Sequence, residues 1–318
     1  SVRERNLLGK GQDIKLGVSL GSLSSLVNLS FTEPYFLERP MAAGFDVFLT
    51  QNDRQSIASY SDKSIGFALR AAWALTEHTT QSARYTLRST NIYNVQPWAS
   101  QIVQSQQGSA ITSEVAETVA WDTRDQRLNP TKGHLLRNSV ALGGLGGTEY
   151  YFRMNMDGVY YQQIIEDFVA SIGGSFGFVL PYNNSNLRLN NLFFIGGDTL
   201  RGFRVGGIGP RDANTTDSLG GQYYYTGTAE LSFPLLGIPK ELGLLGKAFL
   251  DVGSLWGNPN EGNPNYNILD SQLMRVGAGL GIQWISPFGP IRVDYAWPVV
   301  KENWDKTENI RFSFGTRF

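Results

Sequence analysis

The chain has 318 residues, a formal net charge of -1 and no cysteine. A near-zero charge argues against a general nucleic-acid binder, which needs a basic field. The lack of cysteine excludes a disulfide scaffold, a Cys-ligated zinc site and a thiol nucleophile. Only two histidines are present, His78 and His134, which leaves little room for a histidine metal site. We therefore expect no nucleic-acid partner, no metal and no cofactor.

Membrane-spanning helices are also excluded. Mean hydropathy is -0.21. The best uncharged window, residues 168–182, is interrupted by glycines and is shorter than the ~20 apolar residues that a spanning helix needs. Transmembrane barrels, however, hide their apolar residues in alternation, which averages away in such a window. Aromatic residues make up 12% of the chain and charged residues 17%, which excludes a disordered protein.

Strands are predicted along the whole chain from a two-residue alternation of apolar with polar or glycine residues. About fourteen are expected, near residues 12–20, 24–33, 41–51, 64–75, 80–93, 111–122, 134–143, 149–163, 167–180, 222–234, 246–256, 274–285, 289–298 and 308–318. Most have the ~9–11 residues, or somewhat more, that a tilted strand needs to cross a bilayer. Connections such as 33–40 are short, whereas 94–110 and 181–221 are long polar loops, which is typical of outer-membrane barrels.

The alternation is clearest in the last quarter of the chain. Segment 275–285 places its apolar residues on one face and Gly277, Gly279 and Gly281 on the other. A soluble β-sandwich also alternates, but its polar face is usually charged and needs no row of glycines. Glycines on an inward face fit a crowded interior that another segment approaches closely. The pattern therefore favours an all-β transmembrane antiparallel β-barrel over a sandwich.

A short N-terminal segment, residues 1–6, resembles the end of a further strand before the first turn. Bacterial single-chain barrels have even numbers of strands, and this stub plus about fourteen complete strands is an odd number. We therefore expect sixteen strands in the intact protein, at least one of them preceding residue 1. Residues 1–318 are taken as one barrel domain that is incomplete at its N-terminus.

The longest loop holds the most informative motif, FFIGGDTLRGF at 193–203, which is followed by IGPR at 208–211. Further motifs are WDTRD at 121–125, AELSF at 229–233, LDVG at 250–253 and QWISPFGP at 283–290. In this combination and order the sequence resembles the barrel domain of the BamA family of outer-membrane protein assembly factors. The resemblance covers essentially the whole chain, and its specificity comes from the motifs taken together.

The resemblance implies a function, a location and partners. The family inserts and folds β-barrel precursors in the bacterial outer membrane, through a lateral seam between the first and last strands. Its barrel has sixteen strands preceded by periplasmic POTRA domains, so this chain would lack those domains, the first strand and most of the second. The implied partners are unfolded outer-membrane β-barrel substrates, accessory lipoproteins of the assembly complex, periplasmic chaperones and outer-membrane lipid or lipopolysaccharide.

A loop latch is predicted for segment 181–221, which the resemblance places inside the lumen. In the family the Arg of this motif turns back into the barrel and pairs with carboxylates on neighbouring strands. Alternation independently places Glu230 and Asp251 on the inward faces of adjacent strands, and a guanidinium fork suits two carboxylates. The predicted latch consists of Arg201, Gly202, Phe203, Glu230 and Asp251. The alternative is an ordinary surface contact of Arg201.

The last predicted strand suggests a seam. Phe312 and Phe314 lie on its apolar face, Gly315 interrupts it and Phe318 is the terminal aromatic. Glycine weakens ladder packing and allows a bend, and in the family the matching glycine is where the last strand kinks. An opened seam would expose an unpaired edge that templates incoming strands. Gly315 could instead fit a lumen contact, and Phe318 could be a lipid-facing residue as well as a sorting signal.

Other functions find less support in the sequence. Neither histidine lies in a Ser or Asp constellation suited to hydrolysis, so no enzyme is predicted. Asp122 and Asp125 could ligate a cation, but a turn held by contacts of these carboxylates with Arg124 or Arg127 is the favoured interpretation. The remaining alternatives are a related secretion or translocation pore and a passive porin, which would have an open lumen and rings of charge.

Overall fold

The computed structural model describes residues 1–21, 23–235, 237–239, 242–286 and 289–314. The chain divides into two compact units. Unit 1 comprises Ser1–Trp121, Arg137–Asn155 and Val179–Asn191, and unit 2 comprises Asp122–Leu136, Met156–Phe178 and Leu192–Phe318. The described helices are short, and within the described ranges none is long and apolar enough to cross a membrane.

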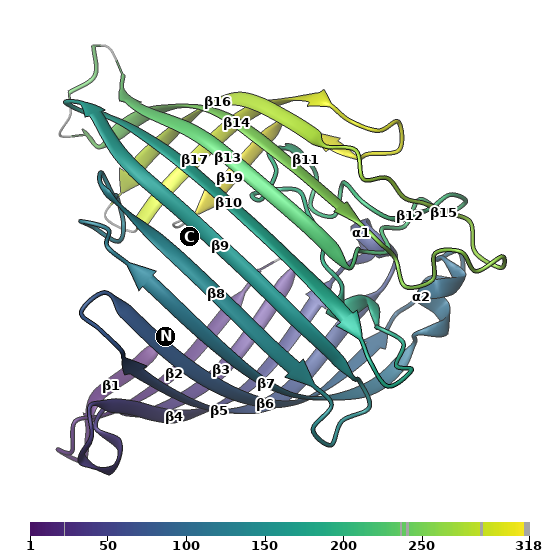
Figure 1. The fold of residues 1–318 in the computed structure, drawn as a ribbon, viewed down its shortest axis with the longest axis horizontal. Helices are drawn as coiled ribbons and strands as arrows, with labels where there is room; N and C mark the ends of the chain where they lie inside the picture. Colours follow the sequence, from purple (N-terminus) through teal and green to yellow (C-terminus); the bar gives the residue numbers. More distant parts are fainter. Residues whose placement is uncertain (22, 236, 240–241, 287–288, 315–318) are drawn as a thin grey trace. The chain divides into compact units, whose positions relative to one another are not determined.

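Unit 1 is built on consecutive strands that pair antiparallel with their neighbours in the chain (Figure 1). They are β1 (Val2–Leu7), β2 (Gln12–Leu20), β3 (Ser24–Glu33), β4 (Met41–Asp53), β5 (Ser61–Ala74), β6 (Thr79–Tyr93) and β7 (Gly108–Asp122). The connections hold the short helices η1 (Phe36–Glu38), α1 (Gln55–Ala58), α2 (Gln101–Ser105) and η2 (Leu189–Asn191). The next strands, β8 (Gly133–Gly143), β9 (Tyr151–Ile165) and β10 (Phe168–Pro181), contribute residues to both units.

Unit 2 continues the same arrangement from β10 onward. Its further long strands are β13 (Tyr223–Pro234), β14 (Leu244–Trp256), β16 (Arg275–Ser286), β17 (Gly289–Val300) and β19 (Ile310–Phe314), paired antiparallel in that order. Short strands lie in the connections: β11 (Gly202–Phe203) pairs with β18 (Thr307–Glu308), and β12 (Arg211–Asp212) pairs with β15 (Ile268–Leu269).

The two faces of each long strand differ as alternation requires. In β14, Asp251 is fully buried whereas its neighbour Leu250 is 47% exposed. In β16, Gly277 is buried and Leu280 is 55% exposed. Each sheet segment therefore has an exposed apolar face and a polar face, and in unit 2 the loop that contains β11 covers the polar face.

The predicted strands agree with the observed ones to within a few residues, and the N-terminal stub forms β1. The prediction of one strand over 308–318 is wrong at its start. Glu308 belongs to the separate strand β18 and pairs with Gly202, whereas the ladder to β17 begins at Ile310. The short helices α1 and α2 lie in connections between strands, where the sequence analysis predicted no helix. Residues 315–318 are outside the described part of the chain.

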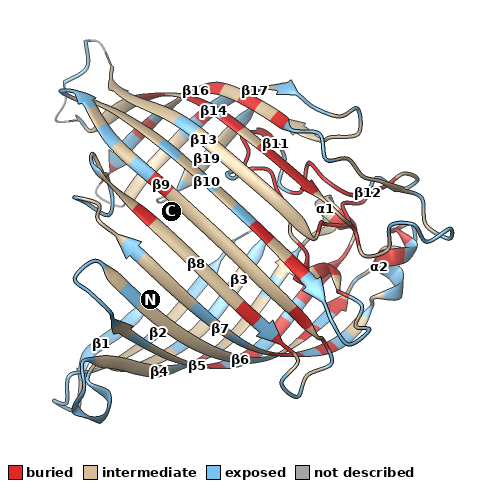
Figure 2. Cartoon of the chain, viewed as in Figure 1, coloured by how far each residue is buried: buried red, intermediate tan, exposed pale blue. Residues whose placement is uncertain are grey.

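The apolar core of unit 2 lies under the loop and not between two sheets. Ile195, Leu200, Phe203 and Ile208 of the loop pack with Leu255 of β14, and all of these side chains are buried. Figure 2 shows β11 and β12 in the colour of buried residues. The loop is thus a folded part of unit 2 rather than a mobile excursion from the sheet.

Candidate functional site

The loop presents Arg201 from a tight turn. Gly197 N–H donates to the carbonyl of Phe203 (2.8 Å), and Gly196 N–H donates to Thr199 Oγ1 (3.1 Å). Gly196 has φ +129°, and a Cβ built on it would lie 1.8 Å from the carbonyl oxygen of Arg204. A side chain at Gly196 would therefore force the two arms of the turn apart. The glycines of the motif allow the turn to close and to direct Arg201 at the sheet.

Arg201 binds Asp251 through a guanidinium fork. Its Nε and Nη2 donate to Asp251 Oδ2 and Oδ1 at 2.7 and 2.8 Å, and its backbone N–H adds a bond of 3.0 Å to Oδ2. Nη1 donates to Glu230 Oε2 at 2.8 Å. The side chains of Arg201 and Asp251 are 1% and 0% exposed. The structure therefore brings together Arg201 and both carboxylates that the sequence singled out, and buries the ion pairs.

Strands β14 and β17 supply further charges that the sequence prediction missed. Asp294 Oδ2 lies 3.7 Å from Arg201 Nη1. Lys247 Nζ donates to Glu230 Oε1 at 3.0 Å, and Arg292 Nη2 lies 3.5 Å from the same oxygen. Cations and carboxylates thus alternate across the cluster, which offsets the desolvation that would destabilise any one charge alone. We call Arg201, Glu230, Lys247, Asp251, Arg292 and Asp294 the latch cluster.

Close packing fixes the guanidinium from its other sides. Its Cζ lies 3.2 Å from the ring centroid of Phe249, a cation–π contact. A Cβ built on Gly277 would lie 2.0 Å from the carbonyl oxygen of Arg201, so only glycine lets the loop reach this depth. Burial acts to lower the pKa of the Arg201 guanidinium, but the bonds and charge of Asp251, with Glu230 and Asp294, outweigh burial and raise that pKa. Arg201 is a permanent cation here.

The same loop is bonded to the chain around the last strand. Gly202 and Phe203 pair with Glu308 and Thr307, and Arg204 N–H donates to the carbonyl of Lys306 at 2.9 Å. Near the start of the motif, Asp198 accepts bonds from Arg311 Nε (2.7 Å) and Nη2 (3.2 Å) and from Ser313 Oγ (2.6 Å). These side-chain bonds, which we call the Asp198 tie, connect the loop to β19. The sequence prediction did not include them.

The described residues of the predicted seam lie on the exposed face of β19. Phe312 and Phe314 pair in register with Val293 and Ile291 of β17 and are 70% and 82% exposed. Gly315 and Phe318 lie outside the described residues, so their assignment to a kink and to the strand end stays a prediction.

The turn after β7 is held as the sequence interpretation favoured. Arg124 Nε and Nη2 donate to Asp122 Oδ1 and Oδ2 at 2.8 and 2.9 Å. Asp125 instead accepts bonds from the side chain and the backbone N–H of Thr131 and from Lys132 N–H. Across the described residues no group of three or more histidine or acidic side chains is arranged to hold a metal ion.

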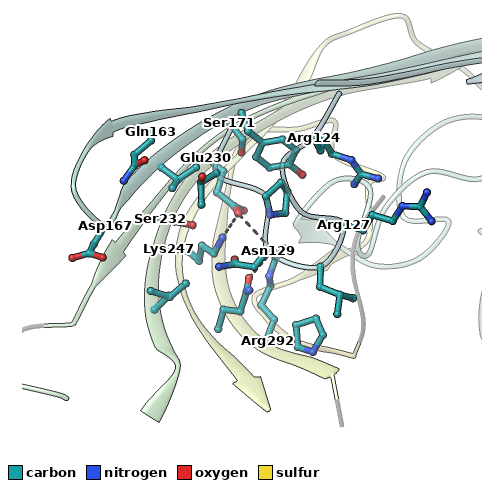
Figure 3. A pocket seen from close by; sticks show the side chains of 18 of the residues that line it. Arg124, Arg127, Asn129, Gln163, Asp167, Ser171, Glu230, Ser232, Lys247 and Arg292 are labelled. Carbon is teal, nitrogen blue, oxygen red and sulfur yellow. Dashed lines mark hydrogen bonds and ion pairs between the residues drawn. The ribbon is translucent and has the colours of Figure 1, made fainter. Parts of the chain in front are cut away.

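A polar cavity of about 200 Å³ opens beside the latch cluster. Figure 3 shows Glu230, Lys247 and Arg292 at its wall, with Arg124 and Asn129 contributed by the turn after β7. Dashed lines mark the contacts of Glu230 with both cations. The members of the latch cluster at the cavity wall are thus paired with one another.

A strand-rich chain with an apolar outer face and a polar face anchoring a folded loop belongs to the membrane-barrel class. The model of the Omp85 superfamily domain matches residues 6–318, so this chain belongs to the Omp85 superfamily.

Several curated relatives cover the whole chain. It is 29% identical to the outer membrane protein assembly factor BamA of Neorickettsia risticii, covering 100% of this chain and 42% of that protein. It is 26% identical to the protein of the same name from Neisseria meningitidis, with 100% and 44% covered. A SAM50-like protein of Drosophila melanogaster is 28% identical, with 98% and 71% covered. The chain thus spans about two fifths of the length of these BamA relatives, and the predicted family resemblance is confirmed.

Solved structures show the fold. BamA from Haemophilus ducreyi lacking POTRA domains 1–3 superposes with a TM-score of 0.86 at 22% identity, covering 98% of this chain and 65% of that one. CdiB from Acinetobacter baumannii gives a TM-score of 0.60 at 16% identity, covering 97% and 54%. The predicted fold class, an all-β antiparallel membrane barrel, is confirmed.

Proposed function

We propose that this chain is the barrel domain of a factor that inserts and folds β-barrel precursors in the bacterial outer membrane. The loop anchored by Arg201 lies in the barrel lumen, and a seam between the first and last strands gives incoming strands an edge to pair with. The proposal requires no catalytic residue and no nucleotide. The similarity to outer membrane protein assembly factors of the BamA type supports the assembly function.

The observation that carries the proposal is the buried latch cluster. A passive porin needs an open lumen, whereas here a folded loop is fixed on the polar face by Arg201 at 1% exposure. The same loop holds the last strand through the Asp198 tie. A loop bonded to β13, β14 and β19 together can keep the strand next to the seam in a defined position while the seam pairs with a substrate.

The proposal includes the location and the partners. The factor would act in the bacterial outer membrane on unfolded β-barrel substrates delivered by periplasmic chaperones. Accessory lipoproteins would bind away from the latch cluster. Outer-membrane lipid or lipopolysaccharide would surround the exposed apolar faces, where residues such as Leu250 and Leu280 lie.

The test is substrate folding in proteoliposomes that contain the full-length natural protein. Wild type is compared with Arg201→Ala and with Arg204→Ala, at equal amounts of folded protein in the membrane. Arg204 is the matched control because it lies three residues away in the same loop and is exposed. We expect wild type and Arg204→Ala to accelerate folding of a β-barrel substrate and Arg201→Ala to lose most of the acceleration.

Two results would contradict parts of the proposal. No acceleration by wild type, with required lipoproteins supplied, would reject the assembly function. Conductance would then separate a steadily open porin from a mostly closed secretion pore. Equal acceleration by wild type and Arg201→Ala would retain the assembly function and reject the functional role of the loop latch.

A further inference from the structure

The long loop that carries Arg201 has a second attachment, which lies earlier in the loop. Residues 182–186 are largely exposed, and burial begins at Leu187, which is 3% exposed. Asn191 follows at the end of η2 and is completely buried. This residue belongs to unit 1, whereas the latch cluster belongs to unit 2. The buried part of the loop thus begins with an amide side chain that must find its hydrogen-bond partners inside unit 1.

Asn191 uses both ends of its side-chain amide. Its Nδ2 donates to Glu149 Oε1 at 2.9 Å, and its Oδ1 accepts a bond from Arg88 Nη2 at 3.1 Å. Its main-chain carbonyl accepts a bond from Arg153 Nη2 at 2.6 Å. Arg88 belongs to β6 and Arg153 to β9, and Glu149 lies in the turn between β8 and β9. One residue of the loop is therefore bonded to two strands and to the turn before the second of them.

Glu149 fixes the orientation of the Asn191 amide. Glu149 is 3% exposed, and its other carboxyl oxygen accepts a bond from the hydroxyl of Thr112 in β7. A carboxylate only accepts hydrogen bonds, so the NH₂ end of the amide faces it, and the oxygen end faces Arg88, which only donates. An aspartate in place of Asn191 would have the same shape but would set two acceptors against each other. Because a buried group without a partner keeps its full desolvation cost, this site accepts asparagine and rejects aspartate.

The chain between Asn191 and Arg201 has little slack. The backbone of Phe193 forms two hydrogen bonds with Gly221, of 2.9 and 3.0 Å. Ile195 is 5% exposed and packs in the apolar core of unit 2. A displacement of Asn191 therefore cannot be absorbed by loose chain and is passed on toward the latch.

We propose that Asn191 is a positioning residue for the latch. Its bonds to Glu149 and Arg88 fix the start of the buried part of the loop, and this start sets the place where Arg201 meets Asp251. The inference rests on the proposed function, in which the latched loop is required for folding of substrates, and adds a second attachment to it. Disturbing the Asn191 amide should loosen the latch without changing any of the latch charges.

The test is amide hydrogen exchange of the full-length natural protein in detergent, followed in peptides that cover 196–203. This segment contains the Arg201 N–H that is bonded to Asp251. In Asn191→Asp the new carboxylate faces Glu149, and exchange in 196–203 should become about tenfold faster, because it proceeds through local opening of the loop. Adding Glu149→Gln supplies an amide that can donate to the new carboxylate. Exchange in this double variant should return to the wild-type rate.

Two further variants control the experiment. Asn186→Asp makes the same change in the exposed part of the loop and should exchange as wild type. Thr112→Val removes the hydroxyl that is bonded to Glu149 and keeps the size of the side chain. It is the milder variant to use if Asn191→Asp does not fold, and it should make exchange in 196–203 about threefold faster, as the loss of one hydrogen bond implies.

Three results would overturn the inference. The first is wild-type exchange in 196–203 in folded Asn191→Asp, or in Thr112→Val where the former does not fold. The second is faster exchange confined to 186–191, which would make the contact a local structural one. The third is a failure of Glu149→Gln to restore the rate, which would reject the assigned contact between the two side chains.

Substrate folding in proteoliposomes separates this inference from the proposed function. We expect Asn191→Asp to lose most of the acceleration given by wild type, and the double variant with Glu149→Gln to regain it. Equal acceleration by wild type and Asn191→Asp, despite faster exchange in 196–203, would overturn the role of Asn191 in assembly. No acceleration by wild type would reject the proposed function, and the exchange experiment would still decide whether Asn191 positions the loop.

Discussion

Each unit contains a charged cluster on the polar face of its sheet, and the two clusters are built differently. In unit 1, Asp46 of β4 accepts bonds from Arg70 and Arg84 at 3.3 and 2.9 Å. In unit 2, Asp251 and Glu230 accept bonds from Arg201 at 2.7 and 2.8 Å. The distances are similar. The difference lies in which part of the chain supplies the cation.

The Asp46 cluster is made by strand register alone. Arg70 and Arg84 stand directly opposite each other on β5 and β6, and Asp46 lies on the adjacent strand. Like charges directly opposite on neighbouring strands are unfavourable, so the shared carboxylate stabilises the pair. The side chain of Arg84 remains 42% exposed. The two cations of this cluster are therefore partly solvated, whereas Asp46 itself is buried.

The latch cluster requires a loop to fold back onto the sheet. Arg201 comes from the connection between β10 and β13 and becomes 1% exposed when it reaches Asp251. Burial changes the energetics, because a buried charge that loses its partner remains desolvated. Bond lengths therefore do not show which cluster loses more stability when its cation is removed. The exposure of the cation, and whether a strand or a loop supplies it, decide that loss.

The largest expected effect is that of Arg201→Ala. Removing this cation leaves Asp251 and Glu230 facing each other without it, and breaking a buried pair costs about 3–5 kcal/mol. The matched substitution Arg84→Ala removes a half-exposed cation and should cost about 0–1 kcal/mol. Urea unfolding of both variants, followed by the loss of the folded band on gels, measures the difference. Similar losses would show that exposure does not separate the clusters.

The second largest effect is expected for Gly277→Ala. The new Cβ would lie 2.0 Å from the carbonyl oxygen of Arg201, so the loop must shift. Overpacking of this kind costs about 1–3 kcal/mol. The control is Gly17→Ala in β2, where the nearest atom would be 3.8 Å away. Trypsin cleavage after the exposed Arg204 should become faster in Gly277→Ala only. Equal cleavage in both variants would mean that the loop does not need this close approach.

Most of the fold could be predicted from sequence because alternation determines which residues share a face. Alternation also placed Glu230 and Asp251 on the polar face. The same alternation applies to Arg292 and Asp294, which belong to the predicted strand 289–298. Alternation could not bring Arg292 and Asp294 together with Arg201. It tells which face of the sheet a side chain is on, but not how far along the barrel axis the residue lies. That position along the axis depends on strand register, which the pairing of β16 with β17 supplies.

The Asp198 tie was beyond sequence reasoning for another reason. Asp198 and Arg311 are separated by 113 positions, and neither lies in a spacing pattern that predicts an ion pair. The tie depends on the turn at Gly196 and on the pairing of β11 with β18. Short helices such as α1 were missed because four residues carry too little periodicity to be recognised.

A smaller effect is expected for Asp198→Asn. The Asp198 side chain is 50% exposed, so its loss should change global stability by about 0.2–1 kcal/mol. Amide hydrogen exchange in residues 310–314 should nevertheless become faster, because β19 loses its bonds to the loop. Glu308→Gln is the control, since Glu308 bonds the same Arg311 without belonging to the loop motif. Unchanged exchange in Asp198→Asn would show that the backbone pairing of β11 with β18 suffices to hold β19.

The smallest effect concerns Asp125, a carboxylate held by neutral donors at a solvent-exposed turn. Burial acts to raise the pKa of its carboxyl, but bonds from Thr131, Lys132 and Gln126 outweigh it and lower that pKa to about 2. The unfolded carboxyl has a pKa of ~3.9. Because the folded value is the lower one, Asp125 stabilises the turn above about pH 4, and the stabilisation is lost as pH falls toward 2. Solvent exposure limits this stabilisation to less than about 1 kcal/mol.

Unfolding measured between pH 5 and pH 2 should show the loss of this stabilisation in wild type and not in Asp125→Asn. Parallel curves for the two proteins would show that the Asp125 carboxylate does not stabilise the fold in this pH range.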